Sequence, residues 1–492
     1  MPPVTLDERI SALVQPAADA VAGFIFYAVP VAGTEFPLIV GWLIIAALVC
    51  TWQFRFIQWW GFRHALAVVR GHYSHPGMAG EVTPFQALTA AVSGTVGLGN
   101  IAGVAVAVGI GGAGATFWMV VAGLLGMATK FVEVTLGVKY RDVHHTAGTV
   151  SGGPMRYLSK GLAERGHPRL GRALAAFFAV CCVGGALGGG NMFQANQSFQ
   201  QVLTVTGGEA SVLAGRGWLF GAGLAALVGL VIIGGIRSIA RVTARVVPFM
   251  AGVYLIAGLV VLVLHVEQLP WALWQVVLGA WSPEGVAGGV VGAMIQGFKR
   301  AAFSNEAGVG SAAIAHSAVQ TDQPASQGFA ALLEPFIDTV VICTMTALVI
   351  VVTGHVYASG VTALAGEVRG VGLTSQAFGS AVAWFPYVLA LAVVLFAYST
   401  MVTWSYYGLK AWTYLLGDNF ATELAFKIIF LIFVVVGSSM QLGPVIDFSD
   451  AMIFAMALAN VVGLYVLMPV VRQELARYWR AVCAGDIVAV KR

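Results

Sequence analysis

Long runs of apolar residues follow one another along this chain, with short polar connections between them. Each run has about the 20 residues that an α-helix needs to cross the hydrocarbon core of a bilayer. A weaker apolar stretch at 17–33 contains Pro30 and two glycines, and we expect it to lie at the membrane interface. The pattern predicts an all-α polytopic membrane protein with spanning segments at 36–59, 84–109, 114–139, 172–204, 217–236, 243–265, 285–320, 329–354, 376–408, 422–440 and 447–471, eleven in all.

Basic side chains are unevenly distributed among the connections, and this predicts the orientation. One set of connections and the carboxyl-terminal tail carry most of the Lys and Arg residues, whereas the opposite set carries only Arg9, Arg216 and Arg369. Because cytoplasmic loops are enriched in Lys and Arg, we expect the N-terminus outside and the C-terminus in the cytoplasm. The loop 141–171 is then cytoplasmic, and its piece "GPMRYLSKGLAER" is expected to form a helix along the membrane surface.

Composition narrows the class of protein further. The 492 residues are 59% hydrophobic and 10% charged, with a net charge of +4, and the mean hydropathy is +0.85. A soluble domain has about 25% charged residues, so this chain belongs in a membrane. The sequence contains no dense basic patch for nucleic acid, no signal-peptide pattern, no Walker motif and no nucleophile–base or metal-ligand pattern. We therefore expect neither an enzyme nor an ATP-driven pump.

The stretch "SGTVGLGN" at 93–100 lies in the middle of the second predicted span. It resembles a potassium-channel filter, but a filter opens to a polar mouth and needs four copies, whereas apolar residues continue here and the chain has one copy. Its glycines let the backbone unwind, which frees peptide groups for a ligand: amides suit a carboxylate and carbonyls suit a cation. A glycine-rich packing seam is the alternative, and it leaves Ser93, Thr95 and Asn100 unexplained.

A second break is expected at "FSNEAG", residues 303–308, within the seventh span. The two breaks begin two five-helix units, and an odd number of spans gives the units opposite orientations in the membrane. We therefore predict an inverted repeat with a binding site between the breaks. The predicted regions are an N-terminal region 1–82, a first repeat 83–270, a second repeat 271–475 and a cytoplasmic tail 476–492.

Ordered motifs across nearly the whole chain are similar to those of one transporter family. They are "GTVGLGNIAGVA" (94–105), "GMATKFVEVTLGVKYR" (126–141), "GGPMRY" (152–157), "GNMFQANQ" (190–197), "FKRAAFSNEAGVGSAAIAH" (298–316), "QGFAALLEPFIDTVVICTMTALVI" (327–350) and "LFAYSTMVTWSYYG" (395–408). By these motifs the chain resembles the alanine or glycine:cation symporters, also called sodium:alanine symporters.

The resemblance implies a leucine-transporter-type 5+5 inverted repeat with one extra N-terminal helix. It also implies sodium-driven uptake of alanine or glycine across the plasma (inner) membrane by alternating access. Sodium is then the coupling ion, with no organic cofactor, and the partners are the amino acid and the lipid bilayer. Without the resemblance, the pattern indicates a secondary transporter for a small anionic or zwitterionic solute. The sequence leaves the preferred amino acid and the oligomeric state open.

The predicted substrate site combines both breaks with the fourth span. Amides of the first break are expected to hold the substrate carboxylate, and Asn305 with carbonyls of the second break the ammonium group. Gln194 and Gln197 recur with Asn191 at i, i+3 and i+6, and Phe193 is expected to wall off the substrate side chain. Hydrogen bonds between helices are the alternative role of these amides. The predicted substrate contacts are Gly97, Gly99, Asn100, Phe193, Gln194, Gln197, Phe303, Ser304 and Asn305.

A sodium site is implied by the resemblance between the first broken helix and the span 376–408. Carbonyls near Val96 and Gly99 and the hydroxyls of Ser399 and Thr400 are the predicted ligands. The alternative for both hydroxyls is a hydrogen bond to the preceding turn of their own helix.

Three charged residues share the seventh span, where charges are costly and often functional. We expect Glu306 to pair with Lys299 or Arg300 as a structural bridge, to carry a proton, or to lie near the substrate amine. The proton interpretation leads to an alternative function, a proton-coupled amino-acid transporter.

Two further pairs of charges lie in predicted spans. We expect Lys130 and Glu133 to extend toward the cytoplasmic interface. Glu334 and Asp338 fall in the first turns of the eighth span, where carboxylates stabilise a helix N-terminus.

Overall fold

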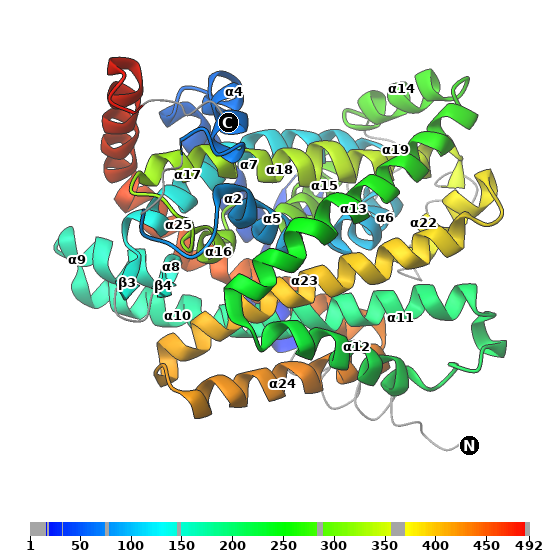
Figure 1. The fold of residues 1–492 in the computed structure, drawn as a ribbon. Coiled ribbons are helices and arrows are strands. Elements are labelled where there is room, and N and C mark those ends of the chain that lie inside the picture. Colours follow the sequence, from blue (N-terminus) through cyan, green and yellow to red (C-terminus); the bar gives the residue numbers. More distant parts are fainter. Residues whose placement is uncertain are drawn as a thin grey trace.

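A computed structural model describes residues 16, 19–31, 33–73, 78–144, 149–282, 289–355 and 370–487. Nearly all of its regular structure is helical (Figure 1). The helices of the first half are α2 (Leu38–Gln53), α3 (Ile57–Trp60), α4 (Phe62–Val69), α5 (Pro84–Thr95), η1 (Gly99–Gly103), α6 (Val104–Gly111), α7 (Gly114–Lys139), α8 (Pro154–Arg156), η2 (Tyr157–Gly161), α9 (Leu162–Glu164), α10 (Pro168–Leu187), η3 (Gly188–Met192), α11 (Phe193–Val205), η4 (Gly208–Ala210), α12 (Gly217–Ile232) and α13 (Gly235–Leu264). Those of the second half are α14 (Leu269–Gly279), α15 (Gly289–Asn305), α16 (Ala312–His316), α17 (Pro324–Ala331), α18 (Leu333–Pro335), η5 (Phe336–Cys343), α19 (Thr344–Val352), α22 (Val371–Ala381), α23 (Phe385–Leu416), α24 (Phe420–Ser439) and α25 (Leu442–Ala484).

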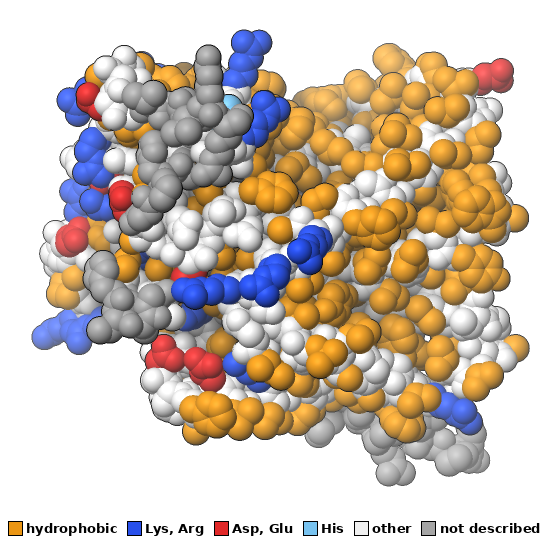
Figure 2. Space-filling view, viewed as in Figure 1, with side chains coloured by type: hydrophobic (Ala, Val, Ile, Leu, Met, Phe, Trp, Pro, Cys, Tyr) orange, Lys and Arg blue, Asp and Glu red, His pale blue; other side chains and the backbone are white. Residues whose placement is uncertain are grey.

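Within the described residues, seven helices are long and apolar enough to cross a membrane, and a bent pair makes up to eight. They include α7, α13 and the continuous stretches Pro168–Val205 and Pro324–Val352. Figure 2 shows Lys and Arg side chains gathered toward one edge of the molecule, while apolar side chains cover most of the rest of this face. The prediction of a polytopic helical membrane protein is therefore confirmed. Arg9 and Arg369, used for the predicted orientation, lie outside the described residues.

Some predicted boundaries are wrong. The segment 376–408 is divided between α22 and α23, because Val382 is extended and Pro386 lies in the first turn of α23, where it is tolerated. The weak stretch 17–33 contains β1 (Ala28–Val31), which forms an antiparallel hairpin with β2 (Thr34–Pro37). The loop 141–171 contains a second hairpin, β3 (Asp142–His144) with β4 (Thr149–Ser151), followed by the predicted helical piece as α8, η2 and α9.

The first predicted break is present. Helix α5 starts with a capping box, in which Thr83 Oγ1 accepts from the Gln86 amide at 3.2 Å and Gln86 Oε1 accepts from the Thr83 amide at 3.0 Å. The helix ends at Thr95, Val96 leaves the helical conformation with ψ 87°, and the chain bends by 51° before it continues as η1 and α6. The span therefore consists of two half-helices.

The second break begins three residues later than predicted. Helix α15 continues through Asn305, and the chain turns at Glu306 (φ 57°), Gly308 (φ 88°) and Gly310 (φ 93°) before α16. Positive φ angles need glycine or strain: two of the three positions are glycines, and Glu306 adopts the left-handed conformation without being one. The last carbonyls of α15, at Phe303 and Ser304, lie at a helix end, where carbonyls lack a continuing helical partner.

A fully buried ion pair joins α7 to α18. Lys130 Nζ lies 3.0 Å from Glu334 Oε1, and the other carboxylate oxygen of Glu334 lies 3.4 Å from His316 Nε2. Lys130 and Glu133 are 0% exposed. The expectation that these two side chains reach the interface is therefore wrong, because their partners lie inside the helix bundle: Glu133 accepts a 2.7 Å bond from Asn460 Nδ2.

Removing one member of this pair is expected to be costly. Lys130→Met leaves the Glu334 carboxylate buried without its ammonium partner, and this is expected to lower the free energy of unfolding by about 3–5 kcal/mol. Adding Glu334→Gln removes the orphaned charge, so the double variant is expected to recover most of that loss. Reversible unfolding in mixed micelles measures both values. Lys427→Met is the matched control, because Lys427 pairs with Glu423 at 3.4 Å on a partly exposed helix face and a change below about 1 kcal/mol is expected. Equal losses of unfolding free energy in Lys130→Met and Lys427→Met would contradict the prediction.

Candidate functional site

The unwound segment of the first break is held by side-chain oxygens. The Gly97 amide donates to Asn100 Oδ1 at 2.8 Å, and the Leu98 amide donates to Gln194 Oε1 at 2.9 Å. An added Cβ at Gly97 would lie 2.4 Å from Thr400 Oγ1 and 3.0 Å from Gln194 Oε1. Glycine is required here because the backbone passes directly against two polar side chains.

The second break lies directly against the first. A Cβ built on Gly99 would lie 3.4 Å from Ser304 Cα and 3.5 Å from the Phe303 ring. The Phe303 ring packs edge-on against Phe193, with 5.4 Å between centroids. The structure therefore brings the predicted residues Gly97, Gly99, Asn100, Phe193, Gln194, Phe303 and Ser304 together where the first break meets the last helical turn of α15, just before the second break.

Asp338 connects the two breaks. Its Oδ1 accepts a 2.6 Å bond from Asn100 Nδ2 and a 3.2 Å bond from Ser304 Oγ, and its Oδ2 accepts a 2.7 Å bond from Thr339 Oγ1. The side chain is 0% exposed and lies in the π-helical turn η5, a distortion that often marks functional sites. A buried carboxylate in a membrane calls for a cation or a proton nearby.

The role of Asp338 was missed from the sequence, where it was assigned to a helix N-terminus. That assignment is wrong because the helical stretch begins at Pro324, and Asp338 lies midway between Pro324 and Val352. The helix starts before the apolar run, because its first turn contains the polar residues Ser326 and Gln327. These two residues are buried inside the protein. An acidic residue at the centre of a span was the signal that could have identified it.

Oxygen atoms gather on the other side of the first break. Thr400 Oγ1 donates to the Ser93 carbonyl at 3.0 Å and lies 3.5 Å from the Val96 carbonyl, while Ser93 Oγ donates to the Ser399 carbonyl at 2.7 Å. The predicted sodium ligands Val96 and Thr400 thus lie together, and Ser399 joins them through its carbonyl, whereas its hydroxyl, the predicted ligand, donates to Met250 Sδ at 3.4 Å. Gly99 faces the end of α15. Ser399 Oγ also bonds to its own helix one turn earlier, as the alternative interpretation expected.

The expected pairing of Glu306 with Lys299 or Arg300 is wrong. Because the chain turns at Glu306, its carboxylate faces α23, where Oε1 accepts a 3.0 Å bond from Trp404 Nε1 and Oε2 accepts from Ser311 Oγ. Lys299 and Arg300 both pair with another acid, Asp450. The guanidinium carbon of Arg300 also lies 5.3 Å from the centroid of the Phe303 ring.

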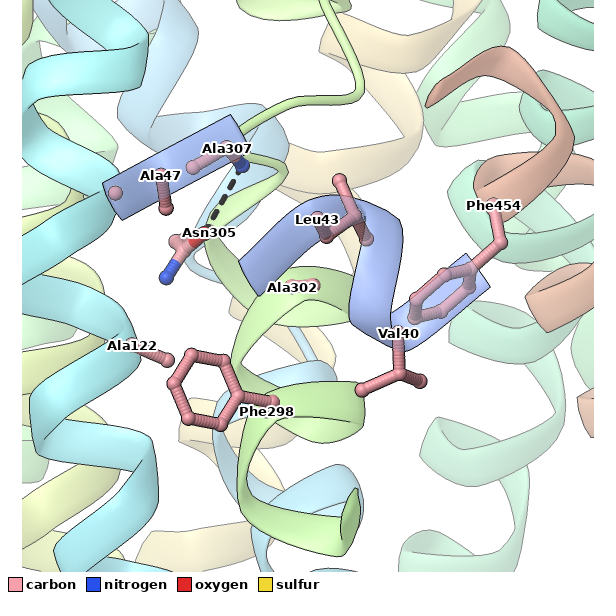
Figure 3. A pocket seen from close by; sticks show the side chains of 10 residues that line it. Val40, Leu43, Ala47, Ala122, Phe298, Ala302, Asn305, Ala307 and Phe454 are labelled. Atoms are coloured by element: carbon pink, nitrogen blue, oxygen red, sulfur yellow. Dashed lines mark hydrogen bonds between the residues drawn. The ribbon is translucent and has the colours of Figure 1, made fainter. Parts of the chain in front are cut away.

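Asn305 lies on a different side of α15. Its Nδ2 donates to Thr339 Oγ1 at 2.9 Å, and its Oδ1 accepts from the Ala307 amide at 2.9 Å. It lines a small cavity of about 20 Å³, room for about one water molecule, together with Leu43 and Phe298. Figure 3 shows this cavity between α2 and α15, with the bond from Ala307 to Asn305 dashed. In this structure Asn305 stabilises the turn of the second break, and it lies on the side of α15 that lines this cavity.

Only one of the three amides in the fourth span reaches the breaks. Gln194 does, whereas Gln197 Oε1 accepts from the Val371 amide at 2.9 Å and Asn191 Nδ2 donates to the Phe430 carbonyl at 2.6 Å. Helical residues turn by about 100° per position, so an i, i+3, i+6 series drifts around the helix. Asn191 and Gln197 therefore bond to neighbouring helices, as the alternative interpretation proposed.

Comparisons with known proteins identify the family. The family model described as the sodium:alanine symporter family matches residues 25–491. The sodium/alanine symporter AgcS of Methanococcus maripaludis is 37% identical over 433 residues, which cover 88% of this chain and 92% of that protein. The probable sodium/glutamine symporter GlnT of Bacillus subtilis is 31% identical over 455 residues, covering 91% of this chain and 89% of that one.

A solved structure shows the fold. The crystal structure of MhsT in complex with L-phenylalanine aligns with a TM-score of 0.52 at 14% identity, covering 80% of this chain and 89% of that one. MhsT has the leucine-transporter-type fold, which agrees with the predicted fold class. The family and its relatives are transporters and support cation-coupled amino-acid symport at the plasma membrane. The chain therefore belongs to the sodium:alanine symporter family and is a multi-pass membrane transporter, not an enzyme.

Proposed function

We propose that this protein imports small neutral amino acids, alanine or glycine, and couples their uptake to sodium by alternating access. The observation that carries the proposal is the contact of the first break, at Gly99, with the end of α15, at Ser304, and the buried carboxylate of Asp338 is bonded to both segments. Two inverted five-helix repeats, 83–270 and 271–475, would rock around this point to expose it to each side in turn.

The substrate is a zwitterion, and the two ends of the site differ in charge preference. Peptide N–H groups around the start of η1 lie at a helix N-terminus and suit the substrate carboxylate. The Gly97 and Leu98 amides donate to Asn100 and Gln194 in this structure, so the carboxylate would bind the Gly99 amide or take the place of these side-chain oxygens. The carbonyls ending α15 and the Asp338 carboxylate suit its ammonium group or a sodium ion bound next to it. The side chain of the substrate would then lie against Phe193 and Phe303.

The oxygen cluster around Thr400 is the proposed sodium site. Hydroxyl and carbonyl oxygens are the hard ligands that sodium prefers, and the Ser93 and Val96 carbonyls there come from the unwound end of α5. Sodium bound at this point would join α5 to α23 and fix the first break in its substrate-binding shape. One sodium ion moving down about 100 mV and a tenfold gradient supplies about 3.7 kcal/mol, enough for a gradient of several hundredfold in the amino acid.

Sodium dependence and size selectivity test the proposal in proteoliposomes. Uptake of labelled alanine is expected to need an inward sodium gradient and to fail when lithium, potassium or choline replaces sodium. Unlabelled glycine is expected to compete well and glutamine poorly, because the two phenylalanine rings close the pocket. Alanine uptake that is equal in sodium and choline would contradict the proposal.

Phe193→Ala tests the pocket wall separately. Removing the ring opens space beside Phe303, so alanine is expected to bind about tenfold more weakly, as a lost apolar contact of about 1–3 kcal/mol predicts. Glutamine is expected to gain on alanine in the same competition assay. Phe199→Ala is the matched control, since this ring packs against Phe220. An unchanged alanine-to-glutamine ratio at Phe193→Ala would contradict the assignment.

Proton coupling through Glu306 is the alternative. It is favoured by one observation: in the part of the chain that the structure describes, this buried carboxylate bonds to Trp404 and Ser311 and forms no ion pair. Glu306→Gln distinguishes the two functions. Concentrative, sodium-driven uptake that persists in this variant would remove the proton mechanism, whereas uptake that survives only as downhill exchange would support it.

A further inference from the structure

A two-part hollow at the end of α2 lies outside the transport site. Its larger part measures about 500 Å³ and is lined by Arg55, Trp60, Arg472 and Trp479, with Gln53, Phe54, Leu475 and Ala476 completing the wall. Its smaller part measures about 350 Å³ and is an apolar groove along α2, lined by Leu48, Val49, Thr51, Trp52, Gln53, Phe56 and Leu125. Gln53 lines both parts, so the hollow and the groove adjoin.

The larger part is basic, and its two arginines lack an acidic partner among the described residues. Arg55 and Arg472 are exposed, and neither forms an ion pair with any residue that the structure describes. The nearest acid along α25, Glu474, is bound to Lys139 at 2.8 Å and to Arg477. Two arginines that converge on one hollow suit a phosphate group, which a guanidinium can bind through two parallel hydrogen bonds.

The backbone separates the two parts with a strained turn. Arg55 (φ 52°) and Phe56 (φ 56°) both adopt the left-handed conformation, which is strained for a non-glycine residue. The turn directs Arg55 into the basic hollow and Phe56 into the apolar groove. Strain of this kind is common at binding sites.

Aromatic side chains place the hollow at a membrane boundary. Trp52 is 74% exposed and Trp59 is 64% exposed, as expected for the aromatic belt where the bilayer meets water. Trp60 packs edge-on against Trp479, with 5.1 Å between ring centroids, and so holds α3 against the C-terminal part of α25. This part of α25 stands beside α4 near the edge where basic side chains gather (Figures 1 and 2).

We propose that the hollow binds an anionic glycerophospholipid of the adjacent leaflet, which the charge distribution predicts to be cytoplasmic. The lipid phosphate would lie between Arg55 and Arg472, and one acyl chain would follow the groove past Leu48 and Trp52. Basic pockets between helices at the cytoplasmic surface have the chemistry that recognises such headgroups. The adjoining apolar groove favours a lipid as the ligand, because an acyl chain can bury apolar surface there. A free phosphate ion has no apolar part that the groove could bind.

The proposed lipid site is also connected to the second break through helix α2. Helix α2 contacts the second break, where Leu43 approaches to 2.5 Å from a Cβ built on Gly308 and lines the cavity beside Asn305. A lipid that holds the end of α2 would therefore stabilise the helix that supports this break.

Native mass spectrometry of purified, delipidated protein tests the proposal. Phosphatidylglycerol is expected to bind about tenfold or more tightly than phosphatidylcholine, because only the former has a net negative headgroup. Arg55→Gln with Arg472→Gln is expected to weaken phosphatidylglycerol binding by about tenfold or more, the scale of a lost charge-assisted contact. Leu48→Trp is expected to weaken binding of both lipids by filling the groove.

Arg480→Gln is the matched control, because Arg480 is an exposed arginine of α25 that does not line the hollow; it is expected to bind phosphatidylglycerol like the wild type. A lipid-free melting temperature equal to that of the wild type shows that each variant is folded. The proposal is overturned if the double variant keeps wild-type affinity, or if both lipids bind equally. Full displacement by soluble glycerol phosphate would likewise overturn it in favour of a free-phosphate site.

Discussion

Gly97→Ala is expected to reduce sodium-dependent alanine uptake by about 100-fold, equivalent to about 2.7 kcal/mol of binding free energy. The added methyl group would lie 2.4 Å from Thr400 Oγ1, so either the first break or Thr400 must move. Movement of Thr400 breaks its 3.0 Å bond to the Ser93 carbonyl, which is part of the proposed sodium site. Initial rates of labelled alanine uptake, measured over a range of sodium concentrations, give the result.

Gly103→Ala is the matched control for this prediction. Gly103 ends the π-helical turn η1 that follows the first break, and a Cβ there would find only Arg300 Cδ, at 3.9 Å. This is an ordinary contact, and alanine in a helix is more stable than glycine by about 0.5–1 kcal/mol. Uptake close to that of the wild type is therefore expected. If Gly97→Ala and Gly103→Ala behaved alike, the close approach at Gly97 would have no role in transport.

Asp338→Asn is expected to have an effect of the same size for a different reason. The amide keeps the shape of the side chain and can still accept from Asn100, but it removes the negative charge between the two breaks. The half-saturating concentration of sodium or of alanine is expected to rise by about 100-fold, as the loss of a charge-assisted contact of about 1.5–3 kcal/mol predicts. Transport assays that vary one solute while the other is saturating reveal which of the two Asp338 binds.

Asp142→Asn is the control for charge removal, because Asp142 is partly exposed and pairs with Arg156 and Lys160 away from the breaks. No change in either half-saturating concentration is expected there. Wild-type kinetics in Asp338→Asn would exclude this carboxylate as a ligand of either solute and leave it a purely structural role.

Much of the fold could be predicted from the sequence, because a bilayer imposes long apolar helices on any chain that crosses it. The first break was also predictable, because an uninterrupted membrane helix does not account for three glycines together with Asn100 at its centre. The second break was placed three residues early. Its position depends on where positive φ angles occur, at Glu306, Gly308 and Gly310, and composition gives only the neighbourhood of such a turn.

The site was less predictable, because its contacts join residues that are far apart in sequence. Asn100 and Asp338 are 238 residues apart, and Lys130 and Glu334 are 204 apart. Local pattern shows that a polar residue lies in a span and does not show its partner. Glu306 illustrates this limit: its neighbours Lys299 and Arg300 were the obvious partners, whereas the turn of the backbone directs it to Trp404.

The central claim is that the first break and the end of α15, where the second break begins, bind one amino acid between them. A structure determined with alanine and sodium tests it most directly. The account predicts density for alanine between Gly99 and Ser304, with its carboxylate within hydrogen-bonding distance of the amides of residues 97–100 and its methyl group against Phe193 and Phe303. Alanine bound elsewhere, such as in the cavity between Leu43 and Asn305, would contradict the account.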